Sequence, residues 1–266
     1  MEIRGIIALD LDGTLLTPKG EVTPLAIQTL RALQEKGYLI LLSTGRPPRA
    51  AESIYRQIGL RGPIVAYNGI WIYDPSEAAP WFSLSFPKEL IQTLYECTAS
   101  TRSCFMMESD STIYVDHIDP FLGKFFPFDG MAMKAVSRKE ELLEDAESLI
   151  LGIEDDALMD QVNEVLQSYP PITLRHWRSA PYGVLYYPYA TKGKALAYLM
   201  ERFAVSKENV YAFGDSDNDV GFLQTAGHPF AMANAKNELL RLNFPLTKKG
   251  NAEDGVALTL IDIFGL

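Results

Sequence analysis

Four short segments of this chain carry residues that could do chemistry together. They hold carboxylates, small hydroxyl side chains, a lysine and an amide, and they are residues 10–14 (DLDGT), 43–46 (STGR), 191–193 (TKG) and 214–219 (GDSDND). Three of them follow short apolar runs, at residues 6–9, 39–42 and 210–213. Such runs between helical patterns predict a parallel sheet, whose ligands bind beyond the carboxyl ends of the strands. We therefore expect the segments to converge there, as a set of groups suited to phosphoryl transfer.

The first segment supplies two carboxylates with different roles. Asp10 can attack phosphorus and form an aspartyl-phosphate. Asp12 lies close enough to protonate the leaving oxygen and later to activate water, because acid and base roles exchange between the two half-reactions. A phosphate dianion repels carboxylates, so the reaction needs a cation, and Mg²⁺ prefers such oxygen ligands. Gly13 allows a sharp turn that Thr14 can brace through its hydroxyl.

The second and third segments supply groups for the phosphate itself. Thr44 and the backbone N–H of Gly45 can hold the transferring phosphoryl oxygens. Lys192 offers a positive charge for phosphate or for Asp10, and we favour it over the nearby Lys194.

The fourth segment completes the expected metal site. Asp215 suits direct ligation of the metal, and Asp219 suits a water-mediated or orienting role. Asn218 stands between them, and we expect Asp217 to face solvent.

Local signals divide the N-terminal part of the chain into helices and strands. Thr23 fits an N-cap, Pro24 the first helical position and Gly37 the stop, which predicts a helix between them. Its buried stripe consists of Ala26, Leu30 and Leu33. Further elements are expected as a helix at 49–58 that ends at Gly59, a strand at 64–66, and a hairpin through 70–73 and 81–84.

The link between residues 14 and 23 is too short for a domain, so a roof over the site must come from an insertion between residues 69 and 191. We expect a Rossmann-like α/β core at residues 1–82 and 190–266 and an α+β cap at residues 83–189. Expected helices of the cap are 87–100 and 156–168, and expected strands are 103–107, 113–116, 149–153, 172–177 and 183–187. These elements suggest two αββ-like halves.

Taken together, the motifs resemble the haloacid dehalogenase (HAD) superfamily, and within it the Cof-type phosphatases with a large α/β cap. The resemblance spans nearly the whole chain through DLDGTLL, STGRP, AYNG, TKGKAL, FGDSDND, AMANA and AEDGVA. It implies a nucleophile at Asp10 and an acid/base at Asp12. It implies a magnesium site formed by the Asp10 side chain, the Asp12 carbonyl and Asp215, with Ser216 nearby and Asp219 in support. The phosphate- and substrate-binding residues that it implies are Leu11 (through its backbone), Thr44, Gly45, Arg46, Asn68, Lys192 and Asn218.

Composition agrees with a globular enzyme that acts on small molecules. The chain has 266 residues, 47% hydrophobic, and a net charge of −10, which disfavours a nucleic-acid partner. The two cysteines, Cys97 and Cys104, are expected to be reduced, which fits a cytoplasmic protein. No apolar stretch is long enough to cross a membrane, and we expect no signal peptide because the chain runs directly into its first strand. We expect a monomer or a weak homo-oligomer.

The sequence therefore predicts a Mg²⁺-dependent phosphatase of small phosphorylated metabolites, and we favour sugar phosphates as the substrates. Two alternatives stay open: a phosphomannomutase-like phosphosugar mutase, and a non-catalytic sugar-phosphate-binding protein, which the presence of both Asp10 and Asp12 disfavours. The cap is expected to choose the leaving group, with Arg178, Tyr182 and Tyr187 as candidate contacts. His117, His176 and His228 lack the spacing of metal ligands and are expected to be structural.

Overall fold

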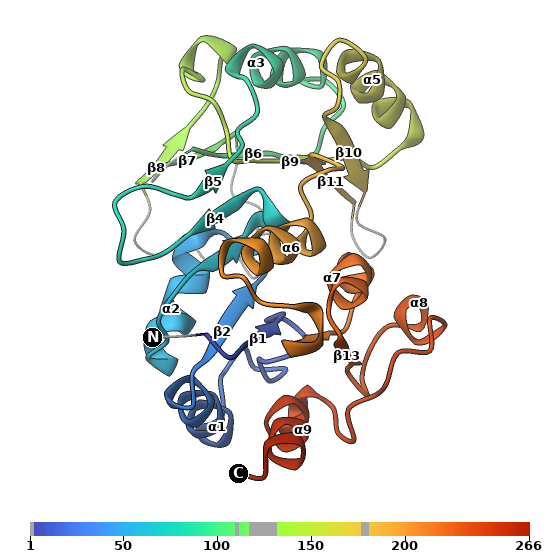
Figure 1. The fold of residues 1–266 in the computed structure, drawn as a ribbon. Helices are drawn as coiled ribbons and strands as arrows, with labels where there is room; N and C mark the ends of the chain where they lie inside the picture. The colour runs from blue at the N-terminus through green and yellow to red at the C-terminus, as the bar shows by residue number, and fades with distance from the viewer. Residues whose placement is uncertain (1–2, 110–111, 117–131, 177–180) are drawn as a thin grey trace. The chain divides into compact units, whose positions relative to one another are not determined.

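The structure is a computed structural model, and it describes residues 3–109, 112–116, 132–176 and 181–266. The chain forms two compact units (Figure 1). One unit consists of Met1–Ser83 and Ala190–Leu266, and the other is Leu84–Tyr189. The sequence divides the chain after residues 82 and 189, and the role of the second unit as a substrate-selecting cap stays a prediction.

The first unit is built on a seven-stranded sheet in the order β13-β12-β1-β2-β3-β4-β5. The first five of these run parallel to their neighbours, and β4 and β5 join antiparallel at one edge. The bounds are β1 (Gly5–Leu9), β2 (Tyr38–Ser43), β3 (Ile64–Ala66), β4 (Trp71–Tyr73), β5 (Phe82–Ser83), β12 (Val210–Gly214) and β13 (His228–Ala231). All five residues of β1 are buried, as expected for a parallel strand covered on both faces.

Helices connect these strands. They are α1 (Pro24–Glu35), α2 (Pro48–Ile58), α6 (Lys192–Arg202), α7 (Val220–Thr225), α8 (Asn237–Leu240) and α9 (Gly255–Phe264), with short 3-10 turns η1 (Tyr67–Gly69), η3 (Lys207–Asn209), η4 (Asp217–Asp219) and η5 (Asn251–Glu253). After β1, the chain adds β2 and β3 toward one edge of the sheet. After β12, it adds β13 toward the other edge. Because parallel crossovers are right-handed, α1 and α2 cover one face of the sheet and α7 covers the other. The helix α6 packs on α7, and α9 packs on α1.

The capping signals of the first two helices are confirmed. Thr23 Oγ1 accepts the Ala26 N–H at 3.1 Å, with Pro24 in the first turn. Gly37, which follows the helix, has φ +93°. Gly59 ends α2 with φ +77°, a left-handed conformation that glycine adopts without strain. The predicted apolar stripe of α1 is buried.

The strand order reverses between the neighbouring strands β1 and β12, because the chain adds later strands on opposite sides of this pair. Ligands bind α/β sheets at such a point, beyond the carboxyl ends of the strands. Asp10 follows β1, Thr44 follows β2 and Asp215 follows β12. The predicted convergence of the motifs therefore follows from the strand order.

The second unit contains a six-stranded sheet in the order β10-β11-β9-β6-β7-β8. Its elements are α3 (Lys88–Cys97), β6 (Phe105–Ser109), β7 (Thr112–Val115), β8 (Ala132–Ala135), η2 (Lys139–Glu141), β9 (Ser148–Gly152), α5 (Asp156–Leu166), β10 (Thr173–His176) and β11 (Tyr182–Tyr186). The helices α3 and α5 lie side by side over one face of the sheet (Figure 1). Both expected helix–strand–strand halves are present, α3-β6-β7 and α5-β10-β11, with β9 between them in the sheet.

Some predictions for this unit are wrong and some fall on residues that are not described. The strand β8 was not predicted, and β6 begins and ends two residues later than expected. Trp177, Arg178 and His117 lie outside the described residues. No helix within the described part of the chain has both the length and the apolar character needed to cross a membrane.

Candidate active site

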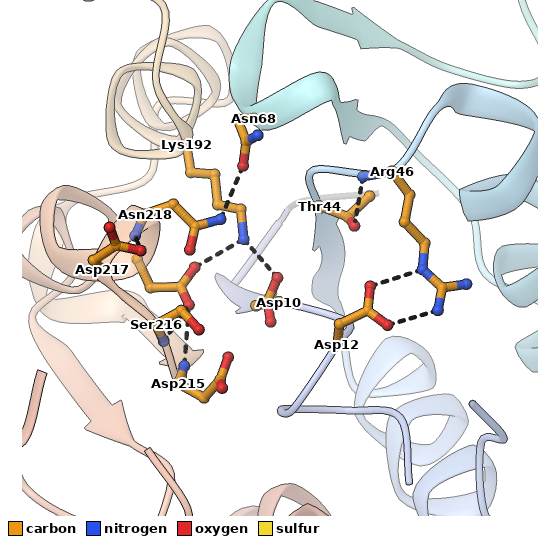
Figure 2. A network of polar contacts seen from close by, with 11 residues as sticks. Asp10, Asp12, Thr44, Arg46, Asn68, Lys192, Asp215, Ser216, Asp217 and Asn218 are labelled. Carbon is orange, nitrogen blue, oxygen red and sulfur yellow. Dashed lines mark hydrogen bonds and ion pairs between the residues drawn. The ribbon is translucent and has the colours of Figure 1, made fainter. Parts of the chain in front are cut away.

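A buried ammonium group joins two of the predicted carboxylates. Lys192, the first residue of α6, places Nζ 2.5 Å from Asp10 Oδ1 and 2.8 Å from Asp219 Oδ1 (Figure 2). The side chains of Lys192 and Asp219 are fully buried, and that of Asp10 is 7% exposed. Lys194, the alternative, is exposed and so takes no part in this cluster.

The second oxygen of Asp219 organises the loop after β12. Asp219 Oδ2 accepts the backbone N–H groups of Asp215 and Ser216, at 3.0 and 3.1 Å. Both oxygens of Asp219 are therefore engaged, one by Lys192 and one by this loop. This geometry favours the orienting role for Asp219 over direct ligation of a metal.

Negative charge exceeds positive charge in this buried cluster. Asp10, Asp215 and Asp219 offer oxygens that all lie within 4.8 Å of one another. When all three are ionised, their charge exceeds that of the Lys192 ammonium by two. Burial raises the pKa of Asp10 to about 8, an effect that Lys192 opposes and Asp219 strengthens. Burial and then Asp219 raise the pKa of Asp215 to about 6. Burial alone would lower the pKa of Lys192, but Asp10 and Asp219 outweigh it and raise that pKa.

The cluster fits a divalent cation. Asp215 Oδ1 is buried and has no hydrogen-bond partner among the described residues, which is costly for a carboxylate oxygen unless a cation binds it. Space around this carboxylate is kept by Gly13, whose φ is +82° and whose missing Cβ would lie 2.4 Å from Asp215 Oδ2. Carboxylate oxygens are the donors that hard cations such as Mg²⁺ prefer. The predicted metal ligands Asp10 and Asp215 are thus brought together.

The residues predicted to hold phosphate form a second group around the end of β2. Thr44 is buried, and its Oγ1 accepts the Arg46 N–H at 3.1 Å, which leaves the hydroxyl hydrogen free to donate elsewhere. Asn68 donates its backbone N–H to Thr44 O at 2.8 Å, and its side-chain oxygen accepts from Asn218 Nδ2 at 2.9 Å. A Cβ at Gly45 would lie 3.1 Å from the Asn68 amide. Thr44, Gly45, Asn68 and Asn218 therefore contact one another through their backbones or side chains.

The backbone carries strain at this second group. Tyr67 and Asn68 have φ values of +48° and +59°, and Gly69 follows with +115°. Left-handed backbone at non-glycine residues persists only where the surroundings fix it, and it is found preferentially at functional sites. At Gly69 a Cβ would lie 2.6 Å from the Thr191 backbone, directly before Lys192. The turn thus packs tightly against the start of α6.

Asp12 and Arg46 form a pair at the exposed side of the site. Arg46 Nε and Nη2 lie 2.7 and 2.6 Å from the two carboxylate oxygens of Asp12, so the pair is bidentate (Figure 2). Figure 2 shows the Asp12 carboxylate turned toward Arg46, whereas that of Asp10 faces Lys192. The side chain of Asp12 is 59% exposed. Arg46, predicted from the resemblance to bind phosphate or substrate, is here placed on the acid/base candidate.

Sequence reasoning missed a group of residues that hold the turn after Asp10. Asn234 Nδ2 donates to Gly13 O at 2.8 Å, and Asn234 Oδ1 accepts the Asn251 N–H at 2.8 Å. Asn251 Nδ2 in turn donates to Leu16 O at 2.7 Å. Asn234 lies within AMANA, and Asn251 directly precedes AEDGVA, two segments that the sequence marks only as parts of the resemblance.

The remaining predicted residues occupy ordinary positions near the cluster. Leu11 is fully buried, so only its backbone could contribute. Asp217 is exposed, as predicted. His228 Nε2 lies 2.9 Å from Glu208 O and its ring stacks on Tyr211, which fits a structural role. Among the described residues, no histidine belongs to a group that could hold a metal.

Two of the candidate cap contacts are described, and both are largely buried in the second unit. The Tyr187 hydroxyl donates to Ser85 O at 2.7 Å, and its ring stacks on Phe86 with centroids 5.1 Å apart. Tyr182 belongs to an apolar cluster with Met106 and Ile150. Tyr187 therefore has a packing role of its own, whatever it contributes to substrate choice.

Comparison with known proteins identifies the class. A model of the haloacid dehalogenase-like hydrolases matches residues 7–260, and the chain belongs to this family. It is 29% identical to the 5-amino-6-(5-phospho-D-ribitylamino)uracil phosphatase YitU of Bacillus subtilis, over 98% of both chains. It is 26% identical to the pyridoxal phosphate phosphatase YbhA of Escherichia coli, over 95% of this chain and 96% of that protein. Among solved structures, a haloacid dehalogenase-like hydrolase from Bacteroides thetaiotaomicron superposes with a TM-score of 0.84 at 26% identity, covering 98% of this chain and 99% of that one.

These findings confirm three predictions from the sequence. The resemblance to haloacid dehalogenase phosphatases is correct, and so is the α/β class with a Rossmann-like core. The chain is an enzyme, a phosphoric monoester hydrolase of this family.

Proposed function

We propose that this phosphatase hydrolyses small phosphorylated metabolites, sugar phosphates above all, with Mg²⁺ and through an aspartyl-phosphate at Asp10. The observation that carries the proposal is the buried cluster in which three carboxyl groups lie within 4.8 Å of one another and one ammonium group, that of Lys192, pairs with two of them. Such an excess of negative charge is expensive to bury for structure alone. It is useful where a divalent cation and a phosphate dianion must be bound together.

Asp10 is the nucleophile in this proposal. Its Oδ1 is fixed by Lys192, so the carboxylate has a single orientation before the substrate arrives. The carboxylate attacks phosphorus, the bond to the ester oxygen breaks, and Asp12 gives its proton to the departing oxygen. In the second half-reaction Asp12 takes a proton from water, which attacks phosphorus, and phosphate and the Asp10 carboxylate are released.

Asp10, the Asp12 carbonyl and Asp215 would hold the metal, with Ser216 nearby and Asp219 fixing the loop. The metal would lower the repulsion between Asp10 and the phosphate dianion. Asp215 suits this role because its Oδ1 is buried and accepts no hydrogen bond from the part of the chain that the structure describes. Mg²⁺ is the preferred ion because the donors are oxygens and because it needs only a few protein ligands besides water and phosphate.

The phosphoryl oxygens are assigned to the group at the end of β2 and to Lys192. Thr44 can donate its hydroxyl hydrogen, because its oxygen already accepts from Arg46 N–H. The Gly45 N–H, the backbone of Leu11 and the amides of Asn68 and Asn218 complete the set of donors. Donors that are fixed before substrate binds would stabilise the transition state electrostatically.

The proposed substrate class rests on chemistry and on the relatives. The named relatives act on a phosphorylated ribityl compound and on pyridoxal phosphate, both small phosphate monoesters. The core motifs can recognise only the phosphoryl group, so the leaving group must be chosen elsewhere. We assign this choice to the second unit, Leu84–Tyr189, as a cap.

The test is a screen for phosphate release from a panel of phosphorylated sugars, sugar alcohols, nucleotides and cofactors. Hydrolysis of sugar phosphates with Mg²⁺, its loss with a chelator and its absence in Asp10→Asn are the expected results. Equal rates with and without the metal would contradict the proposed site. Conversion of one sugar phosphate to its isomer without net phosphate release would instead identify a mutase.

A further inference from the structure

The proposed chemistry gives Asp12 a role in proton transfer but gives no role to Arg46, with which Asp12 forms a bidentate pair. Its two hydrogen bonds, 2.7 and 2.6 Å long, join residues that are 34 positions apart in the sequence. The pair lies at the partly exposed side of the site, where side-chain exposures are 23% for Arg46 and 59% for Asp12. Water screens an ion pair as exposed as this one, which limits its contribution to stability even though its geometry is bidentate. A geometric role explains it better.

The backbone of Arg46 is held from two sides. Its N–H donates to Thr44 Oγ1 at 3.1 Å, and its carbonyl accepts the Tyr67 N–H at 3.1 Å. Tyr67 belongs to the strained left-handed turn. The guanidinium therefore starts from a rigid base, and its planar fork matches the two oxygens of a carboxylate.

We propose that Arg46 is the positioning residue for proton transfer by Asp12. A guanidinium can only donate hydrogen bonds, and a protonated carboxyl group keeps one accepting oxygen and one O–H. When Asp12 carries its proton, one oxygen can stay on Arg46 while the O–H turns toward the leaving oxygen. When Asp12 is a carboxylate, both oxygens return to the fork. Arg46 thus holds Asp12 in both half-reactions without touching the phosphoryl group.

This inference rests on the proposed function, and it differs from a direct role of Arg46 in binding phosphate. A phosphate-binding arginine would affect every substrate alike. A residue that acts through Asp12 would affect the rate only for substrates whose leaving group needs a proton. Phenolates with electron-withdrawing substituents leave unassisted, whereas phenolate and alkoxides need a proton donor.

The experiment compares kcat/KM for a series of substituted phenyl phosphates of similar size, from 4-nitrophenyl to phenyl and 4-methylphenyl phosphate. The ratio kcat/KM reports the step in which the leaving group departs. Arg46→Ala is expected to lower it on the order of 10- to 100-fold for the poorest leaving groups, and to stay within about threefold of the unaltered enzyme for 4-nitrophenyl phosphate. Plotted against leaving-group pKa, log(kcat/KM) should become steeper.

Two further variants make the result decisive. Arg46→Lys keeps the positive charge but loses the bidentate geometry of the guanidinium. Its slope should therefore lie between those of the unaltered enzyme and Arg46→Ala. Arg56→Ala is the matched control, because Arg56 is 72% exposed on α2 and pairs with Glu52, at 2.8 Å, on the same helix. Its slope should equal that of the unaltered enzyme. Parallel lines for Arg46→Ala and the unaltered enzyme, whether displaced or not, would overturn the inference and leave the proposed function intact. Failure of the unaltered enzyme to release phosphate from any ester would overturn both.

Discussion

Replacing Lys192 by methionine tests the charge balance of the buried cluster. The substitution keeps a long unbranched side chain, replaces one methylene by sulfur and removes the ammonium group. Lys192 is fully buried, and its Nζ is 2.5 Å from Asp10 and 2.8 Å from Asp219. The variant therefore leaves buried carboxylates without their counter-ion.

The magnitude follows from these distances. With an effective dielectric constant of about 20, each of the two contacts contributes about 6 kcal/mol of Coulomb attraction. Removal of lysine also abolishes the several kcal/mol needed to desolvate its ammonium group, and loss of one partner from a buried pair costs about 3–5 kcal/mol net. We expect Lys192→Met to lower the free energy of unfolding by about 4 kcal/mol without metal. Added Mg²⁺ should recover part of this loss, because a cation bound to the same carboxylates restores positive charge.

The assay is urea denaturation followed by circular dichroism, with and without Mg²⁺. Lys194→Met is the matched control, since Lys194 lies two residues further along the same helix and is exposed. It should change the free energy of unfolding by less than about 0.5 kcal/mol. Equal losses in the two variants, or no recovery of Lys192→Met with Mg²⁺, would refute the assigned charge balance.

Three further outcomes are expected. Ca²⁺ in place of Mg²⁺ should inhibit phosphate release, because its larger and looser coordination shell allows bidentate carboxylates that spoil the attack geometry; full activity with Ca²⁺ would contradict this. Gly13→Ala should weaken Mg²⁺ binding measured by calorimetry, because the new Cβ would lie 2.4 Å from Asp215 Oδ2 at a φ of +82°, and unchanged affinity would refute the role of this cradle. Tyr187→Phe should cost about 1 kcal/mol of stability in thermal unfolding, since the Ser85 carbonyl loses its 2.7 Å hydrogen bond, and should leave the ranking of substrates unchanged. A changed ranking would restore Tyr187 as a contact to the leaving group.

Most of the core could be predicted because its signals are local. The strands β1, β2 and β12 contain continuous apolar runs, and each is followed by polar residues at its carboxyl end. Thr23, Pro24 and Gly37 mark the first helix through capping chemistry that depends on neighbouring residues alone. The strand order then brings Asp10, Thr44 and Asp215 together.

The strands of the second unit show where local signals fail. The residues of β8 (Ala132–Ala135) are all exposed, so no buried face imposes an alternating pattern. In β6, Glu108 and Ser109 are buried although polar, and the sequence places the end of the strand before them. Pairing with neighbouring strands determines that β8 forms and where β6 ends, and the periodicity of the sequence contains no signal for this pairing.

The residues that form the site were easier to predict than the contacts between them. The pairing of Arg46 with Asp12 depends on the path of the loop after β2, which hydrogen bonds to Thr44 and Tyr67 fix. The same holds for Asn234, which reaches Gly13 across 221 positions of sequence. Residue types and spacing indicate which groups are available. Only the folded loops determine which of them meet.

The central claim is that Asp10 carries the phosphoryl group during turnover. The most direct measurement is to mix the Asp12→Asn variant with Mg²⁺ and an activated aryl phosphate, quench with acid, and analyse the peptides by mass spectrometry. Asp12→Asn retains the nucleophile but lacks the base that activates water, so the intermediate should accumulate. We predict one added phosphoryl group on the peptide that contains Asp10, and none in the Asp10→Asn variant. Continued turnover by Asp10→Asn at the unaltered rate, or a phosphoryl group on another residue, would contradict it.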